Sequence, residues 1–228
     1  MIRWSYSSMS LFQQCPKKYF HLRVAKDIKQ EESEQMRYGL VVHKAAEDYV
    51  RDGTPLPEAF SYMAEPLDRL KKFDGDKYCE HQMGITQDLQ ACSFAAPDVW
   101  WRGIADLLIV NGDTARVVDY KTGKVPADQY KASALLPSKI YAYLCEQVLG
   151  ERPKQIRLLY VQFGKTLVVD VTDDDVAYAE KRVREAWAKI DGWYEEGYFP
   201  PQRNNLCDKW CSFRNICPLY SQVADYPF

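Results

Sequence analysis

An acid and a lysine stand two residues apart at the end of an apolar segment, RVVDYKTGK at residues 116–124. If this segment is a strand, Asp119 and Lys121 share one face and Tyr120 points the other way, because side chains alternate along a strand. Carboxylates bind hard divalent cations such as Mg2+. A bound cation would polarise a phosphodiester and lower the pKa of a bound water. The neighbouring ammonium would position that water, so the pattern indicates metal-assisted hydrolysis.

Further ligands for such a cation stand in two other segments. WWRGIADLLIV places Asp106 in a strand that Asn111-Gly112, a strong hairpin signal, connects to the strand of Asp119. The two aspartates approach one another only if these strands splay or bulge. His43 is a third candidate, and it forms a row with Gly39 and Glu47 at helical spacing. Each of these residues alone has an ordinary structural explanation, and only their combination indicates a metal site.

The elements that must position these side chains follow from hydrophobic periodicity and from turn residues. The mixture of helices and strands predicts one α/β domain around a central mixed sheet flanked by helices. We find no internal repeat and no domain linker. Helices are expected over 7–24, 36–51, 57–72, 133–149 and 173–196, and strands over 77–86, 99–110, 114–120, 155–163 and 166–171.

Composition narrows the class of protein. The chain has 228 residues, of which 46% are hydrophobic and 14% aromatic, which predicts a globular fold. A formal net charge of -2 does not identify a partner, because only the local field steers a polyanion. No apolar run reaches the roughly 18 residues that span a bilayer, and the N-terminus does not resemble a signal peptide. We therefore expect a cytoplasmic protein without membrane association.

Four of the seven cysteines form a separate pattern. Cys207, Cys211 and Cys217 crowd into the tail segment NNLCDKWCSFRNICP, and Cys15 stands near the other end of the chain. Four thiolates suit either a [4Fe-4S] cluster or a structural Zn2+ ion. Four free thiols in a reducing compartment are the remaining alternative. A metal here would couple its binding to folding of a small lobe.

The order of these motifs resembles the RecB-type branch of the PD-(D/E)xK nuclease superfamily, which includes CRISPR-associated and phage exonucleases. The resemblance covers almost the whole chain. Its five matching stretches are SYSSMSLFQQCPKKYF, Gly39 to His43 in GLVVHKAAE, Gly103 to Asp106 in RGIAD, Asp119 to Gly123, and the tail cysteines followed by Pro218. It implies a restriction-endonuclease-like core and metal-dependent hydrolysis of DNA.

The resemblance also implies roles for individual residues. His43, Asp106 and Asp119 would bind Mg2+ or Mn2+ together with the main-chain carbonyl of Val118 or Tyr120, and Lys121 would orient the hydrolytic water. Glu80, in KYCEHQMGI, matches the family's acidic residue on the preceding strand and is a candidate for substrate binding. Cys15, Cys207, Cys211 and Cys217 would hold a [4Fe-4S] cluster that joins segments 1–24 and 200–228 into one lobe, with Zn2+ as the alternative.

Two features depart from the family pattern. The family often has Gln-x-x-x-Tyr in the helix after the active strand, whereas here Pro137 precedes Tyr141 by four residues and Lys139 precedes Tyr143. Lys139 and Tyr141 are candidates for contacting a DNA phosphate, and helix packing is an equal alternative for the tyrosines. The first two tail cysteines are separated by three residues, where the family commonly has two.

The expected function is therefore a Mg2+- or Mn2+-dependent deoxyribonuclease, an exonuclease that acts on DNA ends or single strands in recombination, repair, or phage or CRISPR DNA processing. Its partner would be DNA, with a homo-oligomer or a helicase or recombination partner as further candidates. A non-catalytic DNA-binding or assembly module that retains the fold is the alternative. A purely structural metal protein would leave the order of His43, Asp106, Asp119 and Lys121 unexplained.

Overall fold

The computed structural model describes residues 3–29, 32–112, 114–128, 131–208 and 211–220. The chain divides into two compact units. The first, which we call the sheet unit, consists of residues 1–4 and 33–181, and the second, the cysteine unit, of residues 5–32 and 182–228. Within the described residues, no helix is both long enough and apolar enough to span a membrane.

The sheet unit is built on a six-stranded sheet in the order β2-β1-β3-β4-β5-β6. Only β4 and β5 run parallel among these neighbours, and the other pairs are antiparallel. A parallel connection needs a crossover, and a helix supplies it here. The strands are β1 (Asp76–Ile85), β2 (Ala91–Cys92), β3 (Trp101–Asn111), β4 (Thr114–Lys121), β5 (Gln155–Tyr160) and β6 (Lys165–Asp170), and the crossover helix is α5 (Lys131–Leu149).

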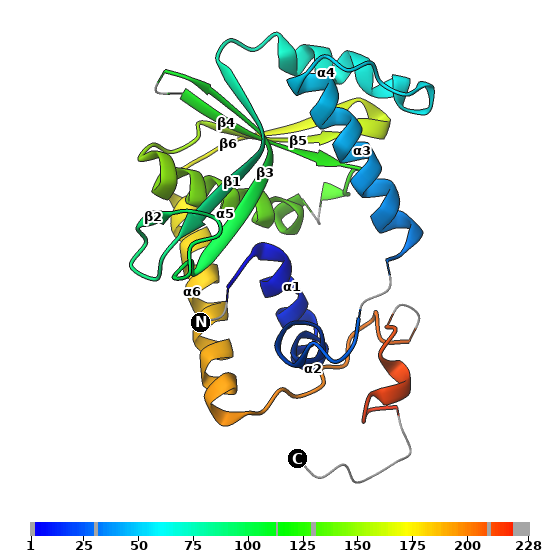
Figure 1. The fold of residues 1–228 in the computed structure, drawn as a ribbon, viewed down its shortest axis with the longest axis vertical. Helices are drawn as coiled ribbons and strands as arrows, with labels where there is room; N and C mark the ends of the chain where they lie inside the picture. Colours follow the sequence, from blue (N-terminus) through cyan, green and yellow to red (C-terminus); the bar gives the residue numbers. More distant parts are fainter. Residues whose placement is uncertain (1–2, 30–31, 113, 129–130, 209–210, 221–228) are drawn as a thin grey trace. The chain divides into compact units, whose positions relative to one another are not determined.

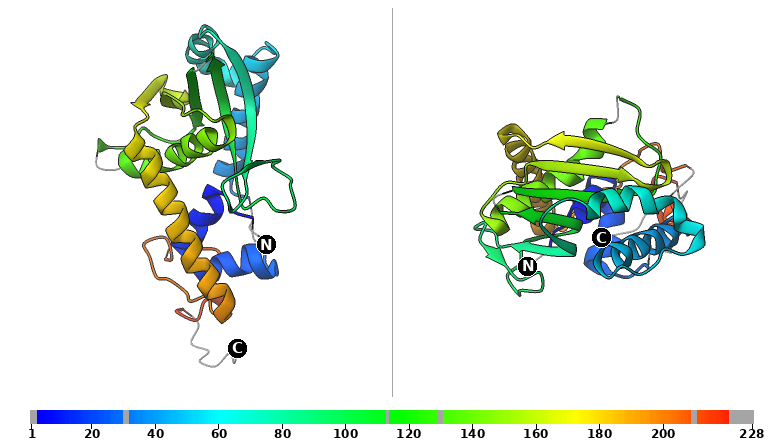
Figure 2. Two further views of the ribbon diagram at one scale, coloured as in Figure 1. Left: turned by 90° about the vertical axis from the view of Figure 1, so that its left-hand side faces the viewer. Right: turned by 90° about the horizontal axis from the view of Figure 1, so that it is seen from above.

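Helices cover both faces of this sheet, with α3 (Glu34–Arg51) and α4 (Ala64–Lys71) on one face and α5 on the other (Figure 1). The further views in Figure 2 show the same layers from the side and from above. Alternation along the strands divides the apolar side chains between two cores. Val118, Tyr120 and Leu159 pack with α3 and α4, whereas Ile156 and Leu158 pack with Ala142 of α5.

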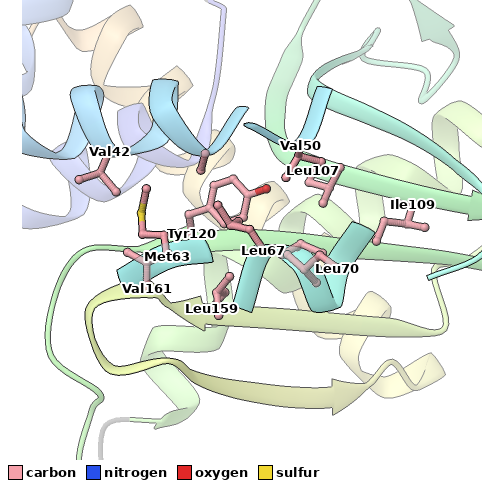
Figure 3. Packing of buried hydrophobic residues seen from close by; sticks show 12 residues of the cluster. Val42, Val50, Met63, Leu67, Leu70, Leu107, Ile109, Tyr120, Leu159 and Val161 are labelled. Atoms are coloured by element: carbon pink, nitrogen blue, oxygen red, sulfur yellow. The ribbon is translucent and has the colours of Figure 1, made fainter. Parts of the chain in front are cut away.

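Tyr120 anchors the first of these cores. Its side chain is only 2% exposed and lies among residues of α3, α4 and the strands (Figure 3). Leu67 and Leu70 of α4 and Val42 of α3 belong to the same cluster. Burial of Tyr120 therefore fixes the end of β4, where its neighbours Asp119 and Lys121 lie.

The cysteine unit combines the two ends of the chain. Its helices are α1 (Tyr6–Gln14), α2 (Pro16–Tyr19), the π-helix η1 (Phe20–Ala25), the end of α6 (Asp173–Glu196) and the short η5 (Arg214–Ile216). Aromatic rings hold it together: Phe12 packs against Trp193 with ring centroids 5.2 Å apart, and Phe20 against Phe199 at 5.1 Å. The Lys17 amide donates to the Pro200 carbonyl at 3.2 Å, which ties the two chain segments through the backbone.

The expected fold class, an α/β domain with a mixed sheet between helices, is confirmed. The differences are local. The expected helix over 7–24 breaks at Cys15, whose extended backbone precedes Pro16. The expected helix over 57–72 divides into the 3-10 helix η2 (Glu58–Met63) and α4, and the strand expected over 155–163 ends at Tyr160 and continues as η4 (Val161–Phe163). The two-residue strand β2 was not expected, because it is too short to show a period.

Candidate metal and catalytic site

His43 of α3 and Asp106 of β3 meet beside the end of β4. The His43 Nδ1 atom lies 3.3 Å from Asp106 Oδ1, and their side chains are 31% and 13% exposed. Burial opposes a charge on the imidazole, but the hydrogen bond with Asp106 and the negative charges of Asp106, Asp119 and Glu80 outweigh it and raise the pKa of His43. The histidine therefore faces a strongly negative environment.

Asp106 stands where the pairing of β3 with β4 stops. The last paired residues are Leu107 and Val118, and beyond them the Tyr120 amide donates to Asp106 Oδ2 at 2.6 Å. A side-chain oxygen has thus taken the place of a backbone acceptor of the ladder. This bond fixes the carboxylate and leaves its Oδ1 atom directed to His43, so the approach of Asp106 to the end of β4 depends on this interruption of the ladder.

Glu80 of β1 joins the same group through an unusual backbone conformation. Its φ of 48° lies in the left-handed region, which is rare for a residue other than glycine and tends to occur at functional sites. The pairing of β1 with β3 includes Cys79 and His81 but omits Glu80, opposite Asp106. One ligand atom each from His43, Glu80 and Asp106 lie within 4.8 Å of one another. Burial and the charges of Asp106 and Glu47 raise the pKa of Glu80.

Asp119 and Lys121 form an ion pair on one face of β4, as alternation along the strand requires. Asp119 is 7% exposed. Burial and the charge of Asp106 raise the pKa of Asp119 to about 6, although Lys121 opposes the shift. For Lys121, burial favours the neutral amine, but the charge of Asp119 outweighs it and raises the pKa, so the ammonium form persists at neutral pH.

Ser138 of α5 is a site residue that sequence reasoning missed. It is completely buried, and its hydroxyl donates to Asp119 Oδ2 at 3.5 Å. Lys121 contacts the same carboxylate oxygen. A serine inside an apolar helix carries no distinctive pattern, so only the placement of α5 over the end of β4 identifies it.

The two residues of α5 considered for substrate contact make contacts with α6 and β3. The Lys139 ammonium contacts Asp175 Oδ1 at 2.7 Å and stands 5.7 Å from the centre of the Tyr178 ring, so it serves the junction of α5 with α6. Tyr141 packs against β3: a Cβ atom built on Gly103 would lie 2.8 Å from Tyr141 Cε1. The Tyr120 ring lies in the core and packs edge-on against the His43 ring with centroids 5.9 Å apart, and the Tyr120 amide reaches Asp106.

The donors present fit a hard divalent cation. Two neighbouring ligands of an octahedral Mg2+ ion at about 2.1 Å stand roughly 3 Å apart, and the separation of His43 Nδ1 from Asp106 Oδ1 is 3.3 Å. After burial, the charge of Asp106 is the next cause that raises the pKa of both Glu80 and Asp119, so Asp106 repels each of these carboxylates. A cation would relieve that repulsion, so chemistry and spacing agree.

The cysteine unit contains a second, separate arrangement. Cys15, Cys207, Cys211 and Cys217 line one cavity of about 240 Å³. Lys17, Lys18, His21 and Arg214 line it as well. The Asn204 amide donates to Cys207 Sγ at 3.3 Å. Among the described residues, the group of ligand atoms within 4.8 Å of one another is that of His43, Glu80 and Asp106, so the four sulfurs are spaced more widely.

Comparison with known proteins gives one family match and two neighbours of similar fold. Residues 3–218 match the family model described as the PD-(D/E)XK nuclease superfamily. A protein from Eubacterium rectale described as a "putative exonuclease" shares the fold with a TM-score of 0.59 and 16% identity, over 98% of this chain and 90% of that one. A protein named SSO0001 gives a TM-score of 0.50 and 15% identity, over 96% and 87%. No curated protein matches significantly.

Proposed function

Because the chain belongs to the PD-(D/E)XK nuclease superfamily, we propose that it is a Mg2+- or Mn2+-dependent deoxyribonuclease with its active site at the end of β4. The observation that carries this proposal is the convergence of three segments, α3, β1 and β3, beside the end of β4. His43, Glu80 and Asp106 gather their ligand atoms within 4.8 Å, and the ion pair of Asp119 with Lys121 lies on the adjoining strand.

Each side chain has a distinct role in this proposal. His43, Asp106 and Asp119, with the Val118 or Tyr120 carbonyl, hold the cation, and Glu80 stands within reach as a further acidic ligand. A divalent cation bound there would polarise the scissile phosphodiester and lower the pKa of a water molecule. Lys121, kept charged by Asp119, orients the attacking water and offsets charge that develops on the phosphate. Ser138 holds the Asp119 carboxylate in place.

The same proposal includes an exonuclease activity at DNA ends or single strands, in DNA recombination or repair. The fold neighbour described as a "putative exonuclease" supports this choice over an internal cut. The test is a cleavage assay with end-labelled linear and circular DNA in Mg2+ or Mn2+. We expect shortening of linear DNA from an end and no cutting of circles.

The variants Asp119→Ala and Lys121→Ala test the assignment of the site. Each is expected to lower the cleavage rate by at least about a hundredfold, the order measured for loss of one preorganised charge-stabilising group. Circular dichroism should show an intact fold. Cleavage at the wild-type rate in both variants would refute the assignment, and binding of DNA by a wild type that does not cleave would instead indicate a non-catalytic DNA-binding module.

For the cysteine unit, we propose a [4Fe-4S] cluster bound by Cys15, Cys207, Cys211 and Cys217. A single Zn2+ ion with Zn–S bonds of about 2.3 Å would hold its sulfurs within about 4 Å of one another. The four cysteines instead surround a cavity of about 240 Å³, which suits a larger group. Of the proposed lobe, residues 1–2, 209–210 and 221–228 lie outside the described residues.

A further inference from the structure

A shallow depression in the sheet unit is lined by residues that neighbour the candidate active site along the chain. It has a volume of about 380 Å³ and is lined by Glu34, Gln35, Tyr38, Thr122, Gly123 and Gln162. Thr122 and Gly123 directly follow Lys121, and the α3 residues precede His43 by about one and a half to two and a half helical turns. The residues that line the depression are therefore close to the proposed metal ligands along β4 and α3.

Tyr38 provides an aromatic surface in this depression. Its hydroxyl accepts a hydrogen bond from Gln162 Nε2 at 2.8 Å and lies 2.8 Å from the Tyr62 hydroxyl. The Phe60 ring packs edge-on against the Tyr38 ring with centroids 6.2 Å apart. Tyr38 nevertheless remains 36% exposed. An exposed ring that its neighbours hold in one orientation is suited to stacking.

The residue types that line the depression indicate which class of ligand it can bind. Among the described residues that line the depression, Glu34 is the acid and there is no lysine or arginine. A phosphate group would therefore be repelled. Gln35, Thr122 and Gln162 instead carry both donors and acceptors. A planar, uncharged ring with a hydrogen-bonding edge matches this combination, and a nucleobase is such a ring.

Gly39 lies between Tyr38 and His43 on α3. It stands one turn before His43 on the same face of α3, and glycine is unfavourable in the interior of a helix. An added Cβ would meet only Thr122 Oγ1, at 3.9 Å, which is an ordinary contact. Packing therefore does not require glycine here. The rise from Gly39 to His43 is about 6 Å, comparable with the step between neighbouring nucleotides of an extended strand.

We propose that this depression binds the base of the unpaired nucleotide next to the scissile phosphate, with the base stacked on Tyr38. This inference rests on the proposed nuclease function and specifies its substrate. Bases in a duplex are stacked and paired, so only a single-stranded segment can place a base against a protein ring. The enzyme therefore prefers single strands or frayed ends.

The test scans one abasic nucleotide along a single-stranded oligonucleotide. Cleavage is measured under single-turnover conditions for wild type, Tyr38→Ala, Tyr38→Phe and the matched control Tyr178→Ala, which removes an exposed tyrosine of α6. We expect one position, adjacent to the cleaved bond, at which the abasic nucleotide slows wild type by about tenfold, a typical effect for loss of one stacked base. Tyr38→Ala should show that loss on intact DNA and no further loss on the abasic strand. Tyr38→Phe keeps the ring without its hydroxyl bonds and should still respond to the abasic nucleotide, whereas Tyr178→Ala should behave as wild type.

A binding measurement separates this inference from the nuclease proposal. With Ca2+ in place of Mg2+, 2-aminopurine at the same position should change its fluorescence on binding to wild type and not on binding to Tyr38→Ala. Three results would overturn the base site and leave the nuclease proposal intact. Cleavage could show no position that is sensitive to an abasic nucleotide, the effects of Tyr38→Ala and of the abasic nucleotide could be independent, or duplex DNA could be cleaved as fast as single strands. A Tyr38-dependent fluorescence change without any cleavage would overturn the nuclease proposal and support the base site. Absence of both binding and cleavage would overturn both.

Discussion

Three influences act on the pKa of the buried Asp119 carboxylate. Burial and the charge of Asp106 favour its protonated form, and the Lys121 ammonium favours its ionised form. The net result is a pKa of about 6, well above the ordinary 3.8. Proton and metal therefore compete for this group within an experimentally accessible range.

This competition predicts a pH dependence with a definite sign. Between about pH 4 and pH 6, the folded protein binds more protons than the unfolded chain, because the pKa of Asp119 is higher in the fold. The stability of the metal-free protein therefore falls as the pH rises through this window. Bound cation requires ionised Asp119, so the rise in Tm on adding Mn2+ should be larger at pH 7 than at pH 5.

Differential scanning fluorimetry with and without Mn2+ at the two pH values measures this effect. Asp119→Asn is the control, since an amide does not titrate and should remove the dependence on pH that Asp119 contributes. A Mn2+-induced increase in Tm that is the same at pH 5 and pH 7 would contradict the assignment of Asp119 as a ligand.

At the scale of elements, the position of α5 over the sheet depends on Gly103. A Cβ atom at this position would lie 2.8 Å from both Leu144 Cδ1 and Tyr141 Cε1, closer than packed carbon atoms approach. The glycine of RGIAD therefore serves the packing of α5 on β3. That packing places Ser138 against Asp119, so it supports the site indirectly.

Gly103→Ala is accordingly expected to destabilise the protein by about 1–3 kcal/mol, as overpacking of a core does. The matched control is Gly123→Ala, because a Cβ there meets nothing within 4 Å; its effect should stay within about 0.5 kcal/mol. Urea unfolding followed by circular dichroism compares the two. Equal stabilities of the two variants would show that α5 does not need the close approach at Gly103.

Most elements could be predicted from the sequence because their signals are local. The helices over Glu34–Arg51 and Asp173–Glu196 carry clear periods. Asn111-Gly112 correctly indicated a hairpin of β3 and β4, but Asn111 still belongs to β3 and pairs with Thr114, so the turn begins one residue later than expected. Asp106 could be named, but its hydrogen bond with the Tyr120 amide could not, because it depends on where the ladder of β3 and β4 ends. The left-handed conformation of Glu80 and the contact of Ser138 are tertiary effects of the same kind.

At the scale of the whole molecule, the chain forms a unit from its two ends. Residues 5–32 and 182–228 make up the cysteine unit, and besides the aromatic contacts the Asn204 side chain donates to the Gln14 carbonyl at 2.9 Å. A cavity lined by cysteines from both segments lies within this unit. A metal group bound by all four cysteines would join the two chain segments and close a loop that contains most of the chain. Binding of that group would therefore be coupled to the stability of the cysteine unit.

Cys211→Ser tests this link. Protein purified without oxygen should lose its broad visible absorbance and its bound iron, and its Tm should fall, because a ligand of a structural cluster is gone. Cys92→Ser, in β2 of the sheet unit, is the matched control and should keep both properties. Wild type that contains zinc without iron or sulfide would identify the alternative metal, and an unchanged Tm and metal content in Cys211→Ser would contradict a structural metal at this cavity.

The central claim is that His43, Glu80, Asp106 and Asp119 surround one divalent cation at the end of β4. Anomalous X-ray scattering from crystals soaked in Mn2+ tests it most directly, because the signal locates the metal independently of the protein model. We expect one strong peak at coordination distance from His43 and Asp106, and no peak there in Asp106→Ala crystals. A manganese peak bound elsewhere, or none near these residues in wild type, would contradict the account.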